Sequence, residues 1–126
     1  MTRTKPRILI AEDNDENRQA LRLLLKLTGY ECLEAADGRT AVELALRERP
    51  ALVLMDLSLP ELDGLQAVRE LRAAGVGIPV IIVSAYDDPE TKQQARAAGA
   101  NDYVTKPLDF EKLKQRIEAL LTAQPA

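Results

Sequence analysis

Four apolar runs of this chain are each followed by a side chain that could take part in chemistry. These side chains are Glu12 and Asp13, Asp56, Ser84 and Lys106. Apolar runs of this kind, separated by helical patterns, are typical of parallel strands that are buried on both faces. The carboxyl ends of such strands meet at one edge of a sheet, which is where open α/β sheets bind ligands. Three carboxylates, one hydroxyl and one ammonium group at that edge point to a divalent cation and a phosphoryl group.

The three carboxylates suggest both a metal and a nucleophile. Neighbouring carboxylates repel one another, and Mg²⁺ relieves this repulsion because it prefers oxygen ligands and commonly binds through a few carboxylates. An aspartate can also attack phosphorus and form an acyl phosphate. We favour Asp56 as the nucleophile because it ends a central strand, although residue types alone do not separate it from Asp13.

Five strands and five helices are expected to position these groups. The strands are predicted at 8–11, 30–34, 52–56, 80–83 and 102–104. The helices are predicted from the Asn14 cap to 26, between the 37–38 turn and Pro50, from 63–64 to the glycines at 75 and 77, at 89–98 and at 109–121. The first helix is expected to bury Leu21, Leu24 and Leu25. This alternation predicts a doubly wound, flavodoxin-like (βα)5 fold with a parallel sheet in the order 2-1-3-4-5.

Length and composition bound the kind of protein. The 126 residues predict one domain over 1–126, with a core from about 7 to 121. A net charge of -3 and the lack of a basic run argue against nucleic-acid binding. No apolar stretch is long enough for a membrane span and no signal-peptide core is present, so we expect a cytoplasmic location without membrane contact.

Cysteine and histidine usage narrow the chemistry further. Cys32 is the only cysteine, so it forms no intrachain disulfide, and it is expected to serve as a small apolar filler in a strand. Histidine is absent, which excludes imidazole metal sites and Ser-His or Cys-His catalysis. A phosphoryl group that comes from a histidine must therefore be brought by another protein.

Five short motifs follow one another in a characteristic order. They are Glu12-Asp13, Asp56 within LMDLSLP, Asp63-Gly64, Ser84-Ala85, and YVTKP at 103–107. Together they resemble the receiver domain of two-component response regulators, of which CheY is a single-domain example, over about Arg7 to Leu121.

The resemblance implies a role for each matching residue. Asp56 would accept a phosphoryl group from a histidine kinase or a histidine phosphotransfer protein. Mg²⁺ would be held by Glu12, Asp13, Asp56 and the backbone carbonyl of Ser58. Ser84 and Lys106 would bind phosphoryl oxygens, Tyr103 would swing inward when Ser84 moves, and the bond between Lys106 and Pro107 would be cis. Glu12 and Ser84 stand where the family more often has Asp and Thr.

The implied output is a change in protein contacts. Phosphorylation would bias the Ser84 and Tyr103 region and the face formed by 89–98, 102–104 and 109–121 toward a downstream protein target. The same face could pair two copies into a dimer. The domain would be a switch rather than an enzyme acting on free substrates, and it could be a stand-alone regulator or a receiver from a longer protein.

The same residues are compatible with other functions. A phosphatase or phosphotransferase with an aspartyl-phosphate intermediate would use similar groups, but haloacid dehalogenase-type enzymes place a second Asp two residues after the nucleophile, where this chain has Ser58. A domain that kept the fold without being phosphorylated is a further alternative. A flavin-binding domain of this topology is disfavoured by the small number of aromatic residues, one Phe, three Tyr and no Trp.

Overall fold

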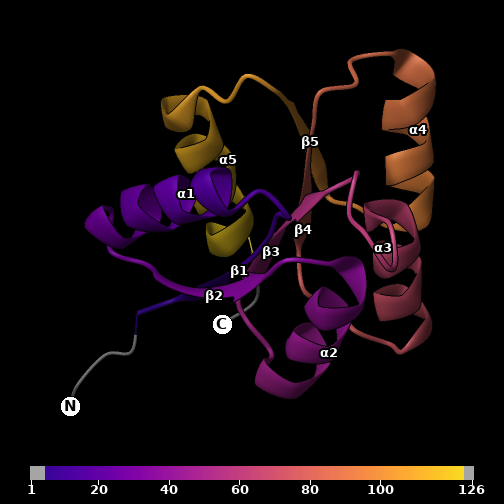
Figure 1. Cartoon of the computed structure of the whole chain (residues 1–126), viewed down its shortest axis with the longest axis horizontal. Coiled ribbons are helices and arrows are strands. Elements are labelled where there is room, and N and C mark those ends of the chain that lie inside the picture. The colour runs from indigo at the N-terminus through magenta and orange to yellow at the C-terminus, as the bar shows by residue number, and fades with distance from the viewer. Residues whose placement is uncertain (1–4, 124–126) are drawn as a thin grey trace.

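The computed structural model describes residues 5–123, and it consists of five strands that alternate with five helices (Figure 1). The strands are β1 (Arg7–Ala11), β2 (Glu31–Ala35), β3 (Leu52–Asp56), β4 (Val80–Ser84) and β5 (Asp102–Thr105). The helices are α1 (Asp15–Leu27), α2 (Gly38–Glu48), α3 (Gly64–Ala73), α4 (Pro89–Ala98) and α5 (Phe110–Thr122). Among the described residues, no helix is both long and apolar enough to cross a membrane.

The strands form one parallel sheet in the order β2-β1-β3-β4-β5. Every residue of β3 and β4 is buried, in agreement with the continuous apolar runs that predicted these strands. The pairing of β1 with β3 aligns Ala11 with Met55, so the residues that follow both strands come out at the same edge. The predicted doubly wound fold and its strand order are therefore confirmed.

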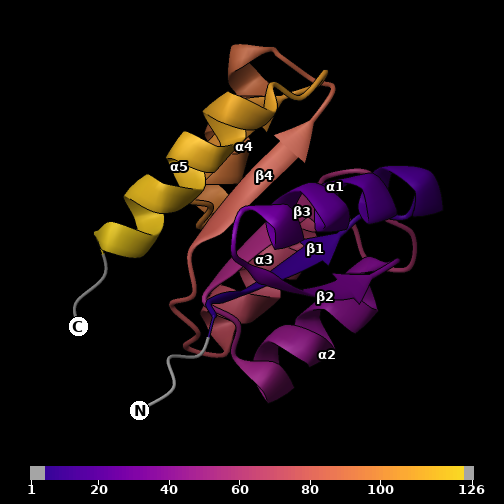
Figure 2. The same cartoon turned by 90° about the vertical axis from the view of Figure 1, so that its left-hand side faces the viewer.

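The helices cover the two faces of the sheet as separate layers. Helices α1 and α5 lie on one face, while α2, α3 and α4 lie on the other (Figures 1 and 2). Each layer closes its own apolar cluster, because alternate residues of a strand point to opposite faces. Leu9, Val53 and Ile82 belong to the cluster under α2, α3 and α4, whereas Ile8 and Leu54 belong to the cluster under α1 and α5.

Each helix begins with a side-chain cap in the loop that follows a strand. The capping residues are Asn14, Asp37, Asp63, Asp88 and Asp109, and each accepts a hydrogen bond from a backbone N–H of the first helical turn. Asp37 and Gly38, which were expected to form a turn, instead start α2 in this way. These caps fix the five loops at the carboxyl edge of the sheet.

Strand β2 lies one residue later than expected. Tyr30, the predicted first residue, donates its backbone N–H to the carbonyl of Leu25 and so completes the end of α1. Gly29 allows the chain to turn back and form this hydrogen bond, because its φ of 106° lies in the left-handed region. The strand consequently runs to Ala35, which pairs with Ala11.

Cys32 on β2 is expected to react slowly with thiol reagents. Burial raises the pKa of its thiol to about 11, so roughly a thousandth of the thiol is ionised at pH 8. We expect the rate of iodoacetamide alkylation, followed by mass spectrometry, to rise about tenfold per pH unit up to the vicinity of that pKa. An alkylation rate that levels off near pH 8.5, as the rate for free cysteine does, would contradict this expectation.

Candidate functional site

Three carboxylates meet at the carboxyl edge of the sheet. Glu12 and Asp13 directly follow β1, and Asp56 is the last residue of the neighbouring strand β3. Each of the three offers an oxygen, and these oxygens all lie within 4.8 Å of one another. The sequence prediction that these residues come together is therefore matched by the geometry, which follows from the adjacency of β1 and β3.

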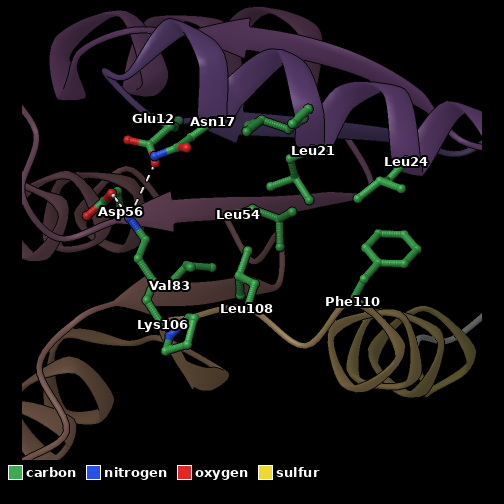
Figure 3. A pocket seen from close by; sticks show the side chains of 14 residues that line it. Glu12, Asn17, Leu21, Leu24, Leu54, Asp56, Val83, Lys106, Leu108 and Phe110 are labelled. Carbon is green, nitrogen blue, oxygen red and sulfur yellow. Dashed lines mark hydrogen bonds and ion pairs between the residues drawn. The ribbon is translucent and has the colours of Figure 1, made fainter.

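Lys106 reaches into this cluster from the end of β5. Its Nζ lies 2.7 Å from Oδ2 of Asp56 and 3.3 Å from Oε1 of Glu12, as the dashed lines of Figure 3 show. Its backbone N–H donates to the carbonyl of Ser84, and the peptide bond to Pro107 is cis, as predicted. The side chain of Asp56 is only 9% exposed and that of Glu12 only 11%. The ammonium group thus supplies the positive charge that this largely buried pair of carboxylates needs.

The electrostatics of the site reflect this crowding. Burial raises the pKa of Glu12, and the negative charge of Asp56 adds to the effect, although the Asn14 backbone and Lys106 oppose it. Burial acts to lower the pKa of Lys106, but its hydrogen bond to Asp56 and the charges of Asp56 and Glu12 outweigh burial and leave that pKa above its usual value. Lys106 is therefore held in its charged form.

Two backbone features hold Asp56 in place. The N–H of Ser58 donates to Oδ1 of Asp56 at 3.0 Å, which leaves Oδ2 to Lys106. Gly64 begins α3 directly against the backbone of Asp56, because a Cβ atom at this position would lie 2.2 Å from the Asp56 carbonyl oxygen. The sequence indicated Gly64 as the start of a helix and as part of the Asp63-Gly64 motif, but not as a neighbour of the Asp56 backbone. Its close approach to Asp56 depends on the packing of α3 and leaves no separate signal in one sequence.

Ser84 and Tyr103 are joined through the loop between β4 and α4. The buried hydroxyl of Ser84 accepts a hydrogen bond from the backbone N–H of Tyr86, and the hydroxyl of Tyr103 donates to the carbonyl of Tyr86 at 2.6 Å. Thr105 and Lys92 both contact Asp87 in the same loop. In this conformation the hydrogen bond of Ser84 leads to the loop and not to Asp56.

A pocket of about 360 Å³ opens beside the carboxylates, between α1 and the segment that leads into α5 (Figure 3). Glu12, Asp56 and Lys106 line one end of it, and the rest is mostly apolar, with Leu21, Leu24, Leu54, Leu108 and Phe110 among the lining residues. Leu24 was expected to be buried, but it is 42% exposed because it lies at this opening. Asp56 thus lies at the polar end of a pocket whose remaining lining is mostly apolar.

Comparison with known proteins agrees with this geometry. The profile of the response regulator receiver domain matches residues 8–118. The chain is 39% identical over 115 residues to response regulator MprA of Mycolicibacterium vanbaalenii and 41% identical over 118 residues to regulatory protein AtoC of Escherichia coli. These alignments cover 91% and 94% of this chain, but only 50% and 26% of the two relatives.

A solved receiver domain has the same fold. The receiver domain of sensor histidine kinase PA1611 from Pseudomonas aeruginosa PAO1 superposes with a TM-score of 0.88 at 34% sequence identity, covering 95% of this chain and all of that one. That structure carries a magnesium ion coordinated in its active-site cleft. With the fold, the edge of carboxylates and the profile match in agreement, the chain belongs to the receiver domain family of two-component response regulators.

Proposed function

We propose that this domain is a switch that accepts a phosphoryl group on Asp56 from a histidine kinase or a histidine phosphotransfer protein. The observation that carries the proposal is the cluster of Glu12, Asp13 and Asp56, in which the ammonium group of Lys106 contacts Asp56 and Glu12. The proposed transfer forms a bond between a carboxylate oxygen of Asp56 and phosphorus. The bond between phosphorus and the donor imidazole nitrogen breaks, and the imidazole leaves.

The donor set fits Mg²⁺. Glu12, Asp13 and Asp56 supply carboxylate oxygens within 4.8 Å of one another, and Mg²⁺ commonly binds through a few carboxylates together with water and phosphate oxygens. We assign the backbone carbonyl of Ser58 as a further ligand. When bound, Mg²⁺ would neutralise charge on the carboxylates and on the phosphoryl oxygens. The magnesium ion in the PA1611 receiver domain supports this assignment by analogy.

Lys106 and Ser84 are proposed to bind the phosphoryl oxygens. Lys106 already contacts Asp56 and can move from the carboxylate to a new oxygen with little displacement. Ser84 would donate its O–H to a phosphoryl oxygen, and because its own oxygen accepts from the Tyr86 N–H, its movement toward the phosphoryl group would pull on the loop before α4. Because Tyr103 holds the carbonyl of the same residue, this movement would release Tyr103. The change would then reach α4, β5 and α5, the face proposed for a downstream target or a second copy.

The histidine donor is proposed to approach through the pocket between α1 and α5. Asp56 lies at the polar end of this pocket, and the half-exposed side chains of Leu24 and Leu108 stand at its apolar rim. A protein donor can bury such a rim, whereas a small phosphodonor needs only the polar end.

The gating step is tested by comparing Ser84→Ala with Ser58→Ala. Loss of a hydrogen bond to a charged phosphoryl oxygen costs roughly 2 kcal/mol. We therefore expect Ser84→Ala to gain a phosphoryl group from acetyl phosphate but to lose most of the accompanying NMR shift of the Tyr103 amide. Ser58→Ala should keep that shift, since its proposed contribution comes from the backbone. An undiminished shift in Ser84→Ala would contradict the proposed gating.

A further inference from the structure

Arg18 braces the loop that carries two of the three carboxylates. Glu12 and Asp13 lie between β1 and α1, and Arg18 is in the first turns of α1. Its Nη1 donates to the backbone carbonyl of Glu12 at 2.8 Å. That carbonyl belongs to the peptide unit between Glu12 and Asp13, so rotation of this unit would move both carboxylates. Arg18 therefore holds the part of the loop from which both side chains emerge.

The other side of Glu12 is fixed as well. Its backbone N–H donates to the carbonyl of Ala35 on β2 at 3.0 Å. The two contacts together pin the peptide units before and after Glu12. Of the two, the contact through Arg18 is the one made by a side chain, so it can be removed by substitution.

Arg18 is itself held in one orientation. Its Nε donates to Glu34 at 3.0 Å and its Nη2 to Asp15 at 2.7 Å, and its side chain is only 13% exposed. The planar guanidinium group can serve three acceptors on three segments at once, which an ammonium group cannot do in the same geometry. The charge of Arg18 is offset by Asp15 and Glu34, so its effect on the loop is mainly geometric.

We propose that Arg18 is a positioning residue for the metal centre, which it serves by fixing the peptide unit between Glu12 and Asp13. This inference depends on the proposed function, because it concerns the same Mg²⁺ site. It concerns a residue that binds neither the ion nor the phosphoryl group.

A neighbouring arginine provides a matched control. Arg22 lies one turn later on α1 and contacts the same carboxylate, with its Nε 3.4 Å from Oε2 of Glu34. Its recorded contact is to Glu34, whereas Arg18 also reaches the Glu12 carbonyl. Substituting Arg22 thus removes one positive charge and one contact to Glu34 but leaves the hydrogen bond between Arg18 and the Glu12 carbonyl in place.

The test is a magnesium titration of the wild type, Arg18→Met, Arg18→Lys and Arg22→Met. Binding is monitored by the NMR chemical shifts of the Glu12 and Asp13 amides. Substitution of a residue that orients metal ligands typically lowers metal affinity about tenfold or more. We therefore expect the Mg²⁺ dissociation constant to rise roughly tenfold in both Arg18 variants. Arg22→Met should bind within about twofold of the wild type, because the contact between Arg18 and the Glu12 carbonyl stays in place. Arg18→Lys keeps the positive charge, so a loss of affinity in this variant reports geometry. Thermal unfolding in EDTA verifies that each variant is folded.

Three outcomes would contradict the positioning role, and one of them would contradict the metal centre as well. If the wild type binds Mg²⁺ and the Arg18 variants bind it equally well or more tightly, the positioning role is wrong while the metal centre stands. If the wild type shows no Mg²⁺-dependent shift, the metal centre itself is wrong and the positioning role fails with it. An equal loss of affinity in Arg22→Met would also overturn the inference, because the effect would then come from charge or from Glu34.

Discussion

Lys106→Met is expected to destabilise the Mg²⁺-free domain by about 2 kcal/mol. The substitution removes the ammonium group that contacts both Asp56 and Glu12, and it leaves two largely buried carboxylates without a positive partner. A fully buried pair would cost more, but the Lys106 side chain is 30% exposed and water can partly replace it. Chemical unfolding in EDTA measures the loss.

The loss should depend on pH and on magnesium. Burial raises the folded-state pKa of Glu12 above its ordinary value of 4.5, so the stabilisation from protonating Glu12 is present at low pH and is lost as pH rises through the raised pKa. Removing the charge of Lys106 raises this pKa further. The deficit of Lys106→Met should therefore shrink as pH falls from 7 toward 5, and Mg²⁺ should stabilise this variant more than the wild type.

Lys92→Met is the control for this substitution. Lys92 also pairs with an aspartate, at 2.6 Å, but both its own side chain and that of Asp87 are well exposed. Exposed pairs contribute little, so we expect a change within about 0.5 kcal/mol. Equal effects of the two lysine substitutions, or a Lys106→Met variant whose stability is independent of pH, would show that Lys106 does not neutralise the site.

Gly64→Ala is expected to cost about 3 kcal/mol and to lower the melting temperature by roughly 12 °C. A Cβ atom at Gly64 would lie 2.2 Å from the carbonyl oxygen of Asp56 and 2.9 Å from Cα of Leu57. Both neighbours are backbone atoms at the end of β3, so they cannot turn away as a flexible side chain would. The start of α3 must then move off the strand, or the strand end that carries Asp56 must shift.

Gly77→Ala is the matched control for Gly64→Ala. Nothing lies within 4 Å of a Cβ atom built at Gly77, and its φ lies outside the left-handed region. We expect a change within about 1 kcal/mol, with a small gain from reduced freedom of the unfolded chain. Calorimetry measures the melting temperatures of both variants. A Gly64→Ala melting temperature equal to that of the wild type would mean that α3 does not approach Asp56 closely.

The sequence was sufficient to predict how the sheet is built. Apolar runs such as 52–55 and 80–83, alternating with helical patterns, are typical of a parallel sheet covered by helices, and such a sheet brings its polar strand ends to one edge. The proximity of Glu12, Asp13 and Asp56 follows from this topology and requires no knowledge of side-chain packing. These residues were therefore accessible to prediction.

Features that depend on packing were not accessible in the same way. Helical periodicity placed Leu24 on the buried side of the first helix, but it cannot show where α5 stops covering that face, and Leu24 is half-exposed at the pocket. Arg18 has no distinguishing signal in the sequence, because a single arginine on an amphipathic helix is usually solvated. Its contact with Glu12 depends on the fold of the loop between β1 and α1. The hydrogen bonds that link Ser84 to Tyr103 through Tyr86 also run through backbone atoms, which leave no pattern in a sequence.

The central claim is that Asp56 carries the phosphoryl group and that transfer requires Mg²⁺. It is tested most directly by intact-mass spectrometry after incubation with acetyl phosphate, with and without Mg²⁺, on the wild type, Asp56→Asn and the control Asp87→Asn. We expect a gain of one phosphoryl group only with Mg²⁺, and only in the wild type and in Asp87→Asn. A phosphoryl group on Asp56→Asn, or a gain in the wild type that is unaffected by removing Mg²⁺, would contradict it.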